Sequence, residues 1–143
     1  MIKNLLLINS DCRILHLSQT VEGTVHDRKL AESCRYPLPE GSDLLQDLGL
    51  KGFELPGVDT LMPFKKLRKR DLTPSEKAFN RIISQSRVWI EHVIASIKRC
   101  RSVKESLRLA GEQAADAVME IACGLHNFRI RNYPWKPIPL GDR

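Results

Sequence analysis

No apolar run in this chain approaches ~18 residues, the length at which a helix can cross a bilayer, so the sequence predicts no transmembrane segment. The apolar stretch near the start covers only residues 5–8, and no small-residue cleavage site follows it, which argues against a signal peptide. Glycine and proline number only 8 each, without a repeat, which excludes a collagen-like chain. With 143 residues, 42% of them hydrophobic, we expect one packed domain and no second one.

Cysteine is also sparse, and its spacing fits no common metal or disulfide motif. Cys12, Cys34, Cys100 and Cys123 form no Cys-x-x-Cys pair, and no histidine lies at zinc-finger spacing from them. A serine nucleophile elbow and a phosphate-cradling glycine loop are missing as well. We therefore expect four buried or neutral thiols and, without a secretory signal, a cytoplasmic location.

Positive charge is concentrated in the second half of the chain. Residues 1–60 hold 6 Lys and Arg against 9 Asp and Glu, a net charge of −3, whereas residues 61–143 hold 17 against 8, a net charge of +9. Residues 65–70 alone carry five positive charges. This asymmetry favours a polyanionic partner, most simply nucleic acid, and the alternative is a solvated basic surface without a partner.

The start of the chain predicts a β-hairpin followed by a short helix. An apolar run at residues 5–8 and an alternating segment at 13–18 flank three turn-forming residues at 9–11. A helix over residues 24–32 should follow, capped by Thr24, and end before the prolines that come next. His26 is expected in a capping arrangement rather than in a catalytic pair.

Two further short strands are predicted at residues 44–46 and 60–64, the second ended or kept at a sheet edge by Pro63. We expect the hairpin to lie in the middle of one mixed sheet, with strand 44–46 added in parallel at one side. The basic run at residues 65–70 then leads into the helical part of the chain.

Two long helices are predicted in the second half. Thr73, Pro74 and Glu76 form a capping box, and the helix that they start should extend to Arg101. Its buried stripe is predicted at Phe79, Ile82, Ile83, Ser86, Ile90, Val93, Ile94 and Ile97. A second capping box at Ser102 starts the next helix, with a stripe at Leu107, Ala110, Ala114, Val118, Ile121, Ala122, Leu125 and Phe128. An extended tail over residues 132–143 completes the chain.

Two acidic residues stand out as candidate metal ligands. Asp47 ends the strand predicted at residues 44–46, and Glu91 follows the apolar Ile90 in the long helix. A carboxylate at a strand end can face one beside the buried stripe of a neighbouring helix, and two such acids can share Mg²⁺ or Mn²⁺. The alternatives are an ion pair between Glu91 and Arg87, four residues before it, and a turn fixed by Asp47.

A series of short motifs also runs in a defined order through residues 3–131. The motifs are 3–9 (KNLLLIN), 22–29 (EGTVHDRK), 44–49 (LLQDLG), 61–66 (LMPFKK), 87–93 (RVWIEHV), 98–101 (KRCR) and 119–129 (MEIACGLHNFR). Taken in this order, they resemble the C-terminal portion of bacterial insertion-sequence transposases of the DDE superfamily. That branch is also similar to eukaryotic Harbinger-type transposases.

The resemblance implies an RNase H-like α/β fold in which three acids bind two divalent cations, Mg²⁺ or Mn²⁺, and cut and join DNA strands. Asp47 matches the family's second Asp, and Glu91 matches its final Glu. The family's first Asp lies on a strand before Lys3, and this sequence lacks that strand. We therefore expect a truncated RNase H-like fold over residues 1–131, catalytically incomplete alone, with a mixed sheet that starts at the hairpin and two long C-terminal helices.

The basic residues are the expected phosphate contacts of such a protein. They are Lys65, Lys66, Arg68, Lys69, Arg70, Arg87, Lys98, Arg99 and Arg101. Trp89 stands where the family often has a basic residue before the Glu. Transposon-end and target DNA is the implied partner, with a second copy or a full-length transposase as a further one. The alternatives are a non-catalytic DNA-binding or regulatory fragment and a decayed transposase remnant.

Overall fold

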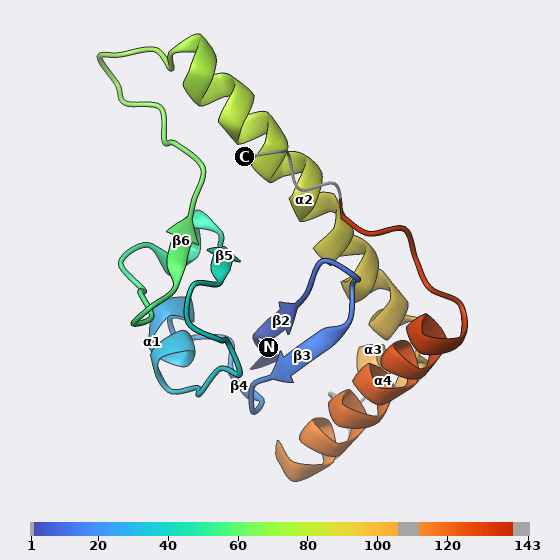
Figure 1. The fold of residues 1–143 in the computed structure, drawn as a ribbon. Helices are drawn as coiled ribbons and strands as arrows, with labels where there is room; N and C mark the ends of the chain where they lie inside the picture. Colours follow the sequence, from blue (N-terminus) through green and yellow to red (C-terminus); the bar gives the residue numbers. More distant parts are fainter. Residues whose placement is uncertain (1, 106–111, 139–143) are drawn as a thin grey trace.

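The computed structural model describes residues 2–105 and 112–138, and it confirms the predicted α/β class (Figure 1). Short strands and one short helix come first, and the long helices follow. In chain order the elements are β1 (Ile2–Lys3), β2 (Leu6–Ile8), β3 (Ile14–Leu17), β4 (Val21–Glu22), α1 (Asp27–Glu32), β5 (Asp43–Leu45), the 3₁₀ turn η1 (Leu48–Leu50), β6 (Asp59–Leu61), α2 (Pro74–Lys98), α3 (Arg101–Glu105) and α4 (Glu112–Asn132).

Strands β2 and β3 form the antiparallel hairpin predicted at the start of the chain. In its turn, the side-chain oxygen of Asn9 accepts hydrogen bonds from the backbone N–H groups of Asp11 and Arg13, at 3.1 and 3.0 Å. Cys12 adopts a left-handed backbone conformation with φ 62°, which is unfavourable for a residue that has a Cβ atom. Its carbonyl oxygen accepts a hydrogen bond from His126 at 2.9 Å, so α4 supports the strained turn.

The expected single mixed sheet is wrong for the described residues, because the strands there form three separate two-stranded sheets. β5 pairs in parallel with β6 and not with the hairpin. Hydrogen bonds from Asp59 N–H to the Ser42 carbonyl, and from Gln46 N–H to the Leu61 carbonyl, extend this parallel ladder at both ends. The backbone of β5 therefore has its hydrogen-bond partners in β6. As predicted, β6 ends before Pro63.

Helix α1 begins three residues later than predicted, and Thr24 is not its cap. His26 is the N-cap, and its Nδ1 atom accepts a hydrogen bond from the Arg28 backbone N–H at 3.3 Å. The capping role expected for His26 is confirmed. The helix buries Leu30 and Ala31.

Helix α2 begins with the predicted capping box, in which Thr73 and Glu76 each accept a hydrogen bond from the other's backbone N–H. It buries Ile83, Ser86, Val93, Ser96 and Ile97. Ile82, which the predicted stripe included, is exposed. The N-terminal half of α2 lies away from the hairpin, so fewer side chains cover it (Figure 1).

The predicted start of the second long helix is wrong, because α3 already begins before Ser102. Leu107 and Ala110 of its predicted stripe lie outside the described residues. In α4 the buried side chains are Ala115, Ala122, Cys123, His126 and Ile130, whereas the predicted Ile121, Leu125 and Phe128 are 65%, 47% and 66% exposed. The buried face carries small side chains such as Ala122 and Cys123, which allow close packing against α2 and β3.

The core lies where the hairpin, the C-terminal half of α2 and α4 meet (Figure 1). His126 is fully buried there. Its Nε2 donates to the Cys12 carbonyl at 2.9 Å, and its Nδ1 shares a hydrogen bond of 2.9 Å with the Ser96 hydroxyl. The side-chain amide of Asn127 exchanges two hydrogen bonds of 2.9 Å with the backbone of Ile14, which fixes α4 to β3.

An extended segment follows α4, as the sequence predicts. Trp135 stacks edge-on against His126 with ring centroids 5.4 Å apart, and the Ile138 N–H donates to the Ser10 carbonyl at 2.8 Å. Residues 133–138 therefore pack back onto the domain. Among residues 2–105 and 112–138, no helix is long and apolar enough to cross a membrane.

Candidate functional site

Asp47 follows β5 and begins the 3₁₀ turn η1. Its Oδ1 atom accepts a hydrogen bond from the Leu48 backbone N–H at 2.8 Å. The preceding residue, Gln46, is buried, and its side-chain amide donates to the Phe53 carbonyl at 2.9 Å. This internal bond fixes the chain around η1, and the second carboxylate oxygen of Asp47 faces Arg87 of α2. The turn-fixing alternative for Asp47 is therefore present in the structure.

Glu91 lies on an exposed side of α2, two residues before the fully buried Val93. Burial of Val93 and Ile97 against the hairpin and α4 sets the rotation of the helix. That rotation turns Arg87 and Glu91, one helical turn apart, toward the β5–β6 unit.

The guanidinium group of Arg87 joins the two acids. Its Nη2 lies 3.4 Å from Oδ2 of Asp47, and its Nε lies 3.9 Å from Oε1 of Glu91. The side chains of Asp47, Arg87 and Glu91 are 56%, 59% and 65% exposed. At this exposure each contact stabilises the fold only weakly, by about 0–1 kcal/mol. The arrangement nevertheless brings two acids from different elements to one cationic group.

This arrangement suits a cation but does not form a complete metal site. Carboxylate oxygens are the donors that Mg²⁺ and Mn²⁺ prefer, and both acids already face the positive charge of Arg87. In residues 2–105 and 112–138, no group of three or more His, Cys, Asp or Glu side chains could hold a metal ion. The chemistry of Asp47 and Glu91 therefore fits a divalent cation, and their number falls short of the three acids that the family resemblance implies.

The basic run at residues 65–70 lies in the extended connection between β6 and α2. Asn80 holds this connection to α2, because its side-chain amide bonds the N–H and the carbonyl of Phe64 at 2.7 and 2.9 Å. The rings of Phe64 and Phe79 also meet edge-on, with centroids 5.4 Å apart. Sequence reasoning missed Asn80, since no local pattern marks a contact across 16 positions.

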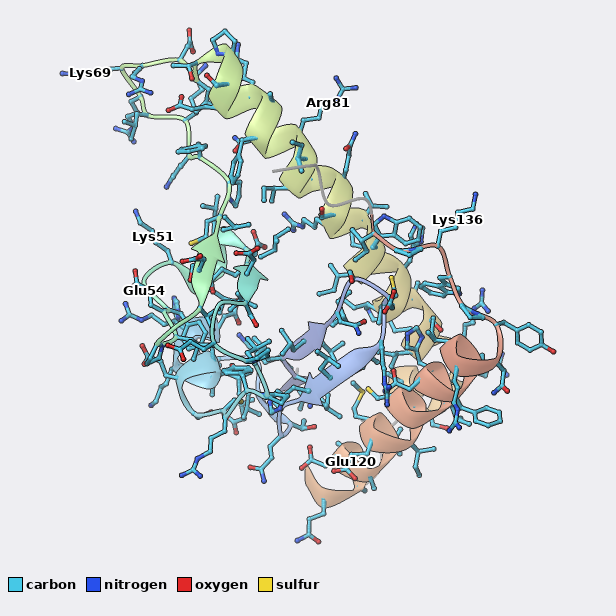
Figure 2. The ribbon with its side chains drawn as sticks, in the orientation of Figure 1. Lys51, Glu54, Lys69, Arg81, Glu120 and Lys136 are labelled. Carbon is cyan, nitrogen blue, oxygen red and sulfur yellow. The ribbon has the colours of Figure 1, made fainter. Side chains whose placement is uncertain are left out.

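Two of the five basic residues in this run are held by neighbouring acids. Lys66 pairs with Asp71 at 2.7 Å, and Arg70 pairs with Glu76 at 2.7 Å. The Thr73 backbone N–H first, and then the Arg70 guanidinium, hold the pKa of Glu76 below its usual value. Lys65, Arg68 and Lys69 are exposed and have no ion pair within the described residues, and Lys69 points outward at the tip of the connection (Figure 2).

The remaining predicted phosphate contacts lie at the other end of α2. Lys98 and Arg99 end this helix, Arg101 begins α3, and all three are exposed. The 25 residues of α2 make a helix about 37 Å long, and the two groups lie toward its opposite ends. The structure thus divides the predicted cations into two groups, with Arg87 between them at the acidic pair.

Comparison with known proteins adds one positive finding. A family model described as DDE superfamily endonuclease matches residues 1–127. No curated protein and no solved structure shows a significant match to the chain. The matched range contains both acids, Arg87 and all the predicted phosphate contacts.

Proposed function

Because the chain belongs to the DDE superfamily of endonucleases, we propose that it supplies the C-terminal part of an RNase H-like transposase domain of the insertion-sequence, Harbinger-like branch. Such a domain cuts DNA and joins the cut strands during transposition. The observation that carries the proposal is the meeting of Asp47 and Glu91, 44 positions apart in the sequence, at Arg87. These two acids match the second and the last acid of the family pattern.

Asp47 and Glu91 are the residues that would hold a divalent cation. When bound, such a cation activates a water molecule or a 3′-hydroxyl and stabilises the leaving oxygen in phosphodiester chemistry. The backbone hydrogen bond at Oδ1 orients Asp47, and the buried side of α2 orients Glu91. Arg87 would offset one of their two negative charges when no cation is present and would contact a DNA phosphate when one is.

The two groups of basic residues would hold the DNA on either side of the acids. The two groups lie toward opposite ends of α2, a helix of 25 residues and about 37 Å. Lys65, Arg68 and Lys69 form no ion pair within residues 2–105 and 112–138, so phosphates can bind them without displacing an acid of that part. Both ends of the helix can therefore contact the backbone of one duplex.

Asp47 and Glu91 would supply two of the three acids of the metal site. No third acid joins Asp47 and Glu91 within residues 2–105 and 112–138. Because Mg²⁺ demands near-octahedral coordination, two carboxylates hold a pair of cations poorly. We therefore expect the chain by itself to bind DNA and a cation but to cleave DNA weakly or not at all.

A second candidate is a non-catalytic DNA-binding or regulatory role. The observation that favours it is the ion pairing of both acids with Arg87, since Arg87 already supplies a positive charge between them. In that case the basic residues would bind DNA, and the acids would only position Arg87.

The effect of Mn²⁺ on DNA binding separates the two candidates. We would measure the affinity for a labelled duplex by fluorescence anisotropy, with and without Mn²⁺ at matched ionic strength. The variants Asp47→Asn and Glu91→Gln remove the charges but keep the shape, and Asn remains a good cap for η1. Glu120→Gln is the matched control, because Glu120 is an exposed acid on α4 without an ion pair in the described part (Figure 2).

If the acids hold a cation at a DNA phosphate, Mn²⁺ tightens binding of the unmodified chain and of Glu120→Gln severalfold. It then fails to tighten binding of Asp47→Asn and Glu91→Gln. Equal weakening of all four proteins would favour the non-catalytic role, because Mn²⁺ would then act only as a counterion. Absence of duplex binding at about 50 mM salt would contradict both candidates.

A further inference from the structure

A groove lies along one side of α2. Trp89, His92, Ala95, Ser96 and Arg99 line it from the helix, and Trp135 closes it from the extended segment after α4; its volume is about 280 Å³. The five helical residues lie at positions i, i+3, i+6, i+7 and i+10, so they share one side of the helix.

The side chains of the groove combine flat aromatic surface with positive charge. Both indoles of the chain, Trp89 and Trp135, lie here, and the imidazole of His92 meets Trp89 edge-on with centroids 5.8 Å apart. Arg99 adds one guanidinium, and Nη1 of Arg129 donates to the hydroxyl of the lining residue Ser96 at 3.3 Å. None of the described residues that line the groove carries a carboxylate.

Trp135 is held in place by contacts on both sides. Its ring packs edge-on against the fully buried His126, and Ile138, three residues later, is bonded to the hairpin turn. Trp89 packs partly against the core cluster. Both indoles are therefore pre-positioned, with part of each surface left to the groove, so a flat ligand can bind without large rearrangement.

We propose that this groove binds an unpaired nucleobase of a DNA strand, stacked against Trp89 and Trp135, with its phosphate on Arg99 and Arg129. The inference rests on the proposed DNA function and adds a subsite to it. Indole rings stack on every base, and arginine neutralises the adjoining phosphate. The volume lies just below the usual range for small-molecule pockets, about 300–1,000 Å³, which suits one planar ring and excludes a duplex.

The chain itself provides the reporter for a test. Its only two tryptophans line the groove, so intrinsic tryptophan fluorescence reports on this place alone. The full chain would be titrated with a single-stranded oligonucleotide of about ten nucleotides, a length within the range that single-strand sites cover. The same length of abasic strand, with equal phosphates and no bases, and the matching duplex are the comparison ligands.

Two variants and one control separate stacking from charge. Trp89→Leu removes one stacking surface while it leaves Trp135 as the reporter and as the partner of His126. Arg99→Gln removes the charge at the groove. Arg81→Gln makes the same change at an exposed arginine of α2 that is not part of the groove and has no ion pair in the described residues (Figure 2). Circular dichroism checks that each variant is folded.

We expect the single strand to quench the fluorescence and the abasic strand to quench it far less. Trp89→Leu and Arg99→Gln should each lower the affinity for the single strand about tenfold, in line with the stacking of one base, while Arg81→Gln lowers it less than twofold. Equal quenching by normal and abasic strands, or equal loss in all three variants, would overturn the groove as a base site. Duplex binding that survives such a result would leave the proposed function standing, whereas loss of all DNA binding would contradict both.

Discussion

Arg87 lies between Asp47 and Glu91, with 3.4 Å from its Nη2 to the first carboxylate and 3.9 Å from its Nε to the second. The three side chains come from a turn after β5 and from adjacent turns of α2. The contact thus links the β5–β6 unit to the long helix. The single positive charge of Arg87 lies close to both acids and offsets one of their two negative charges.

Replacing Arg87 by glutamine should therefore strengthen binding of Mn²⁺. The competing guanidinium disappears, and two neighbouring carboxylates are left without a cation, which raises their attraction for a metal ion several times over. Because the ion pairs are exposed, the free energy of unfolding should fall by less than about 1 kcal/mol. Mn²⁺ titration and urea unfolding measure both effects, with Arg81→Gln as control. Loss of Mn²⁺ affinity in Arg87→Gln would show that Arg87 helps rather than competes.

The unpaired cations of the basic run should dominate DNA binding by that run. Changing Lys65, Arg68 and Lys69 together to alanine should reduce the slope of log K against log salt by about 0.9 for each, or about 2.7 in all. Changing Lys66 and Arg70 should have a smaller effect for each residue, since Asp71 and Glu76 already neutralise them. Anisotropy titrations over a range of salt give the slopes. An equal reduction of the slope for each residue in the two sets would mean that the ion pairs of Lys66 and Arg70 open without cost when DNA binds.

Removing the buried imidazole should destabilise the fold strongly. His126→Ala leaves a cavity between α2, α4 and the hairpin, and it removes the hydrogen-bond partner of the Cys12 carbonyl and one of the partners of the Ser96 hydroxyl. We expect a loss of about 3 kcal/mol in the free energy of unfolding. Tyr133→Ala is the control, because Tyr133 is 81% exposed, and it should change the stability by less than about 0.5 kcal/mol. Urea unfolding followed by circular dichroism compares them, and a similar small change in both would contradict this role of His126.

The capping box should make the stability of α2 depend on acid pH. The pKa of Glu76 is lowered in the folded state, so its carboxylate stabilises the fold above its unfolded pKa of about 4.3, and this stabilisation disappears as pH falls through the folded pKa. Glu76→Gln keeps a hydrogen-bond acceptor for Thr73 but loses the charge. The unmodified chain should therefore melt higher than this variant near neutral pH and at the same temperature well below pH 4. A constant difference over that range would show that the charge of Glu76 is not responsible.

Local signals in the sequence predicted the elements whose hydrogen bonds are themselves local. The polar turn of the hairpin and the Thr73–Glu76 box each depend on residues within a few positions, and both are confirmed. From the sequence, Asp47 was expected after a strand and Glu91 beside the buried stripe of a helix, and in the structure both acids contact Arg87. Arg87 was predicted only to pair with Glu91, four residues later. Its contact with Asp47 was not predicted, because the two residues are 40 positions apart.

Features that depend on packing between distant segments could not be predicted in this way. Leu125 and Phe128 were predicted to be buried because their side chains are large and apolar. In the structure they lie on the exposed face of α4, and smaller side chains on its other face fill the core. β5 pairs with β6 because of the path that the chain takes through η1. No periodic pattern in the sequence predicts that path. The groove was missed for the same reason, since Trp89 and Trp135 are brought together only by the packing of the segment after α4.

The binding of Mn²⁺ to the DNA-free chain tests most directly whether Asp47 and Glu91 form one cation site. Electron paramagnetic resonance of free Mn²⁺ counts the bound ions in the unmodified chain, in Asp47→Asn, in Glu91→Gln and in Glu120→Gln. We predict about one bound Mn²⁺ per chain, lost equally in either single variant and retained in Glu120→Gln, because one ion needs both carboxylates. Unchanged binding in Asp47→Asn or in Glu91→Gln would contradict a shared site.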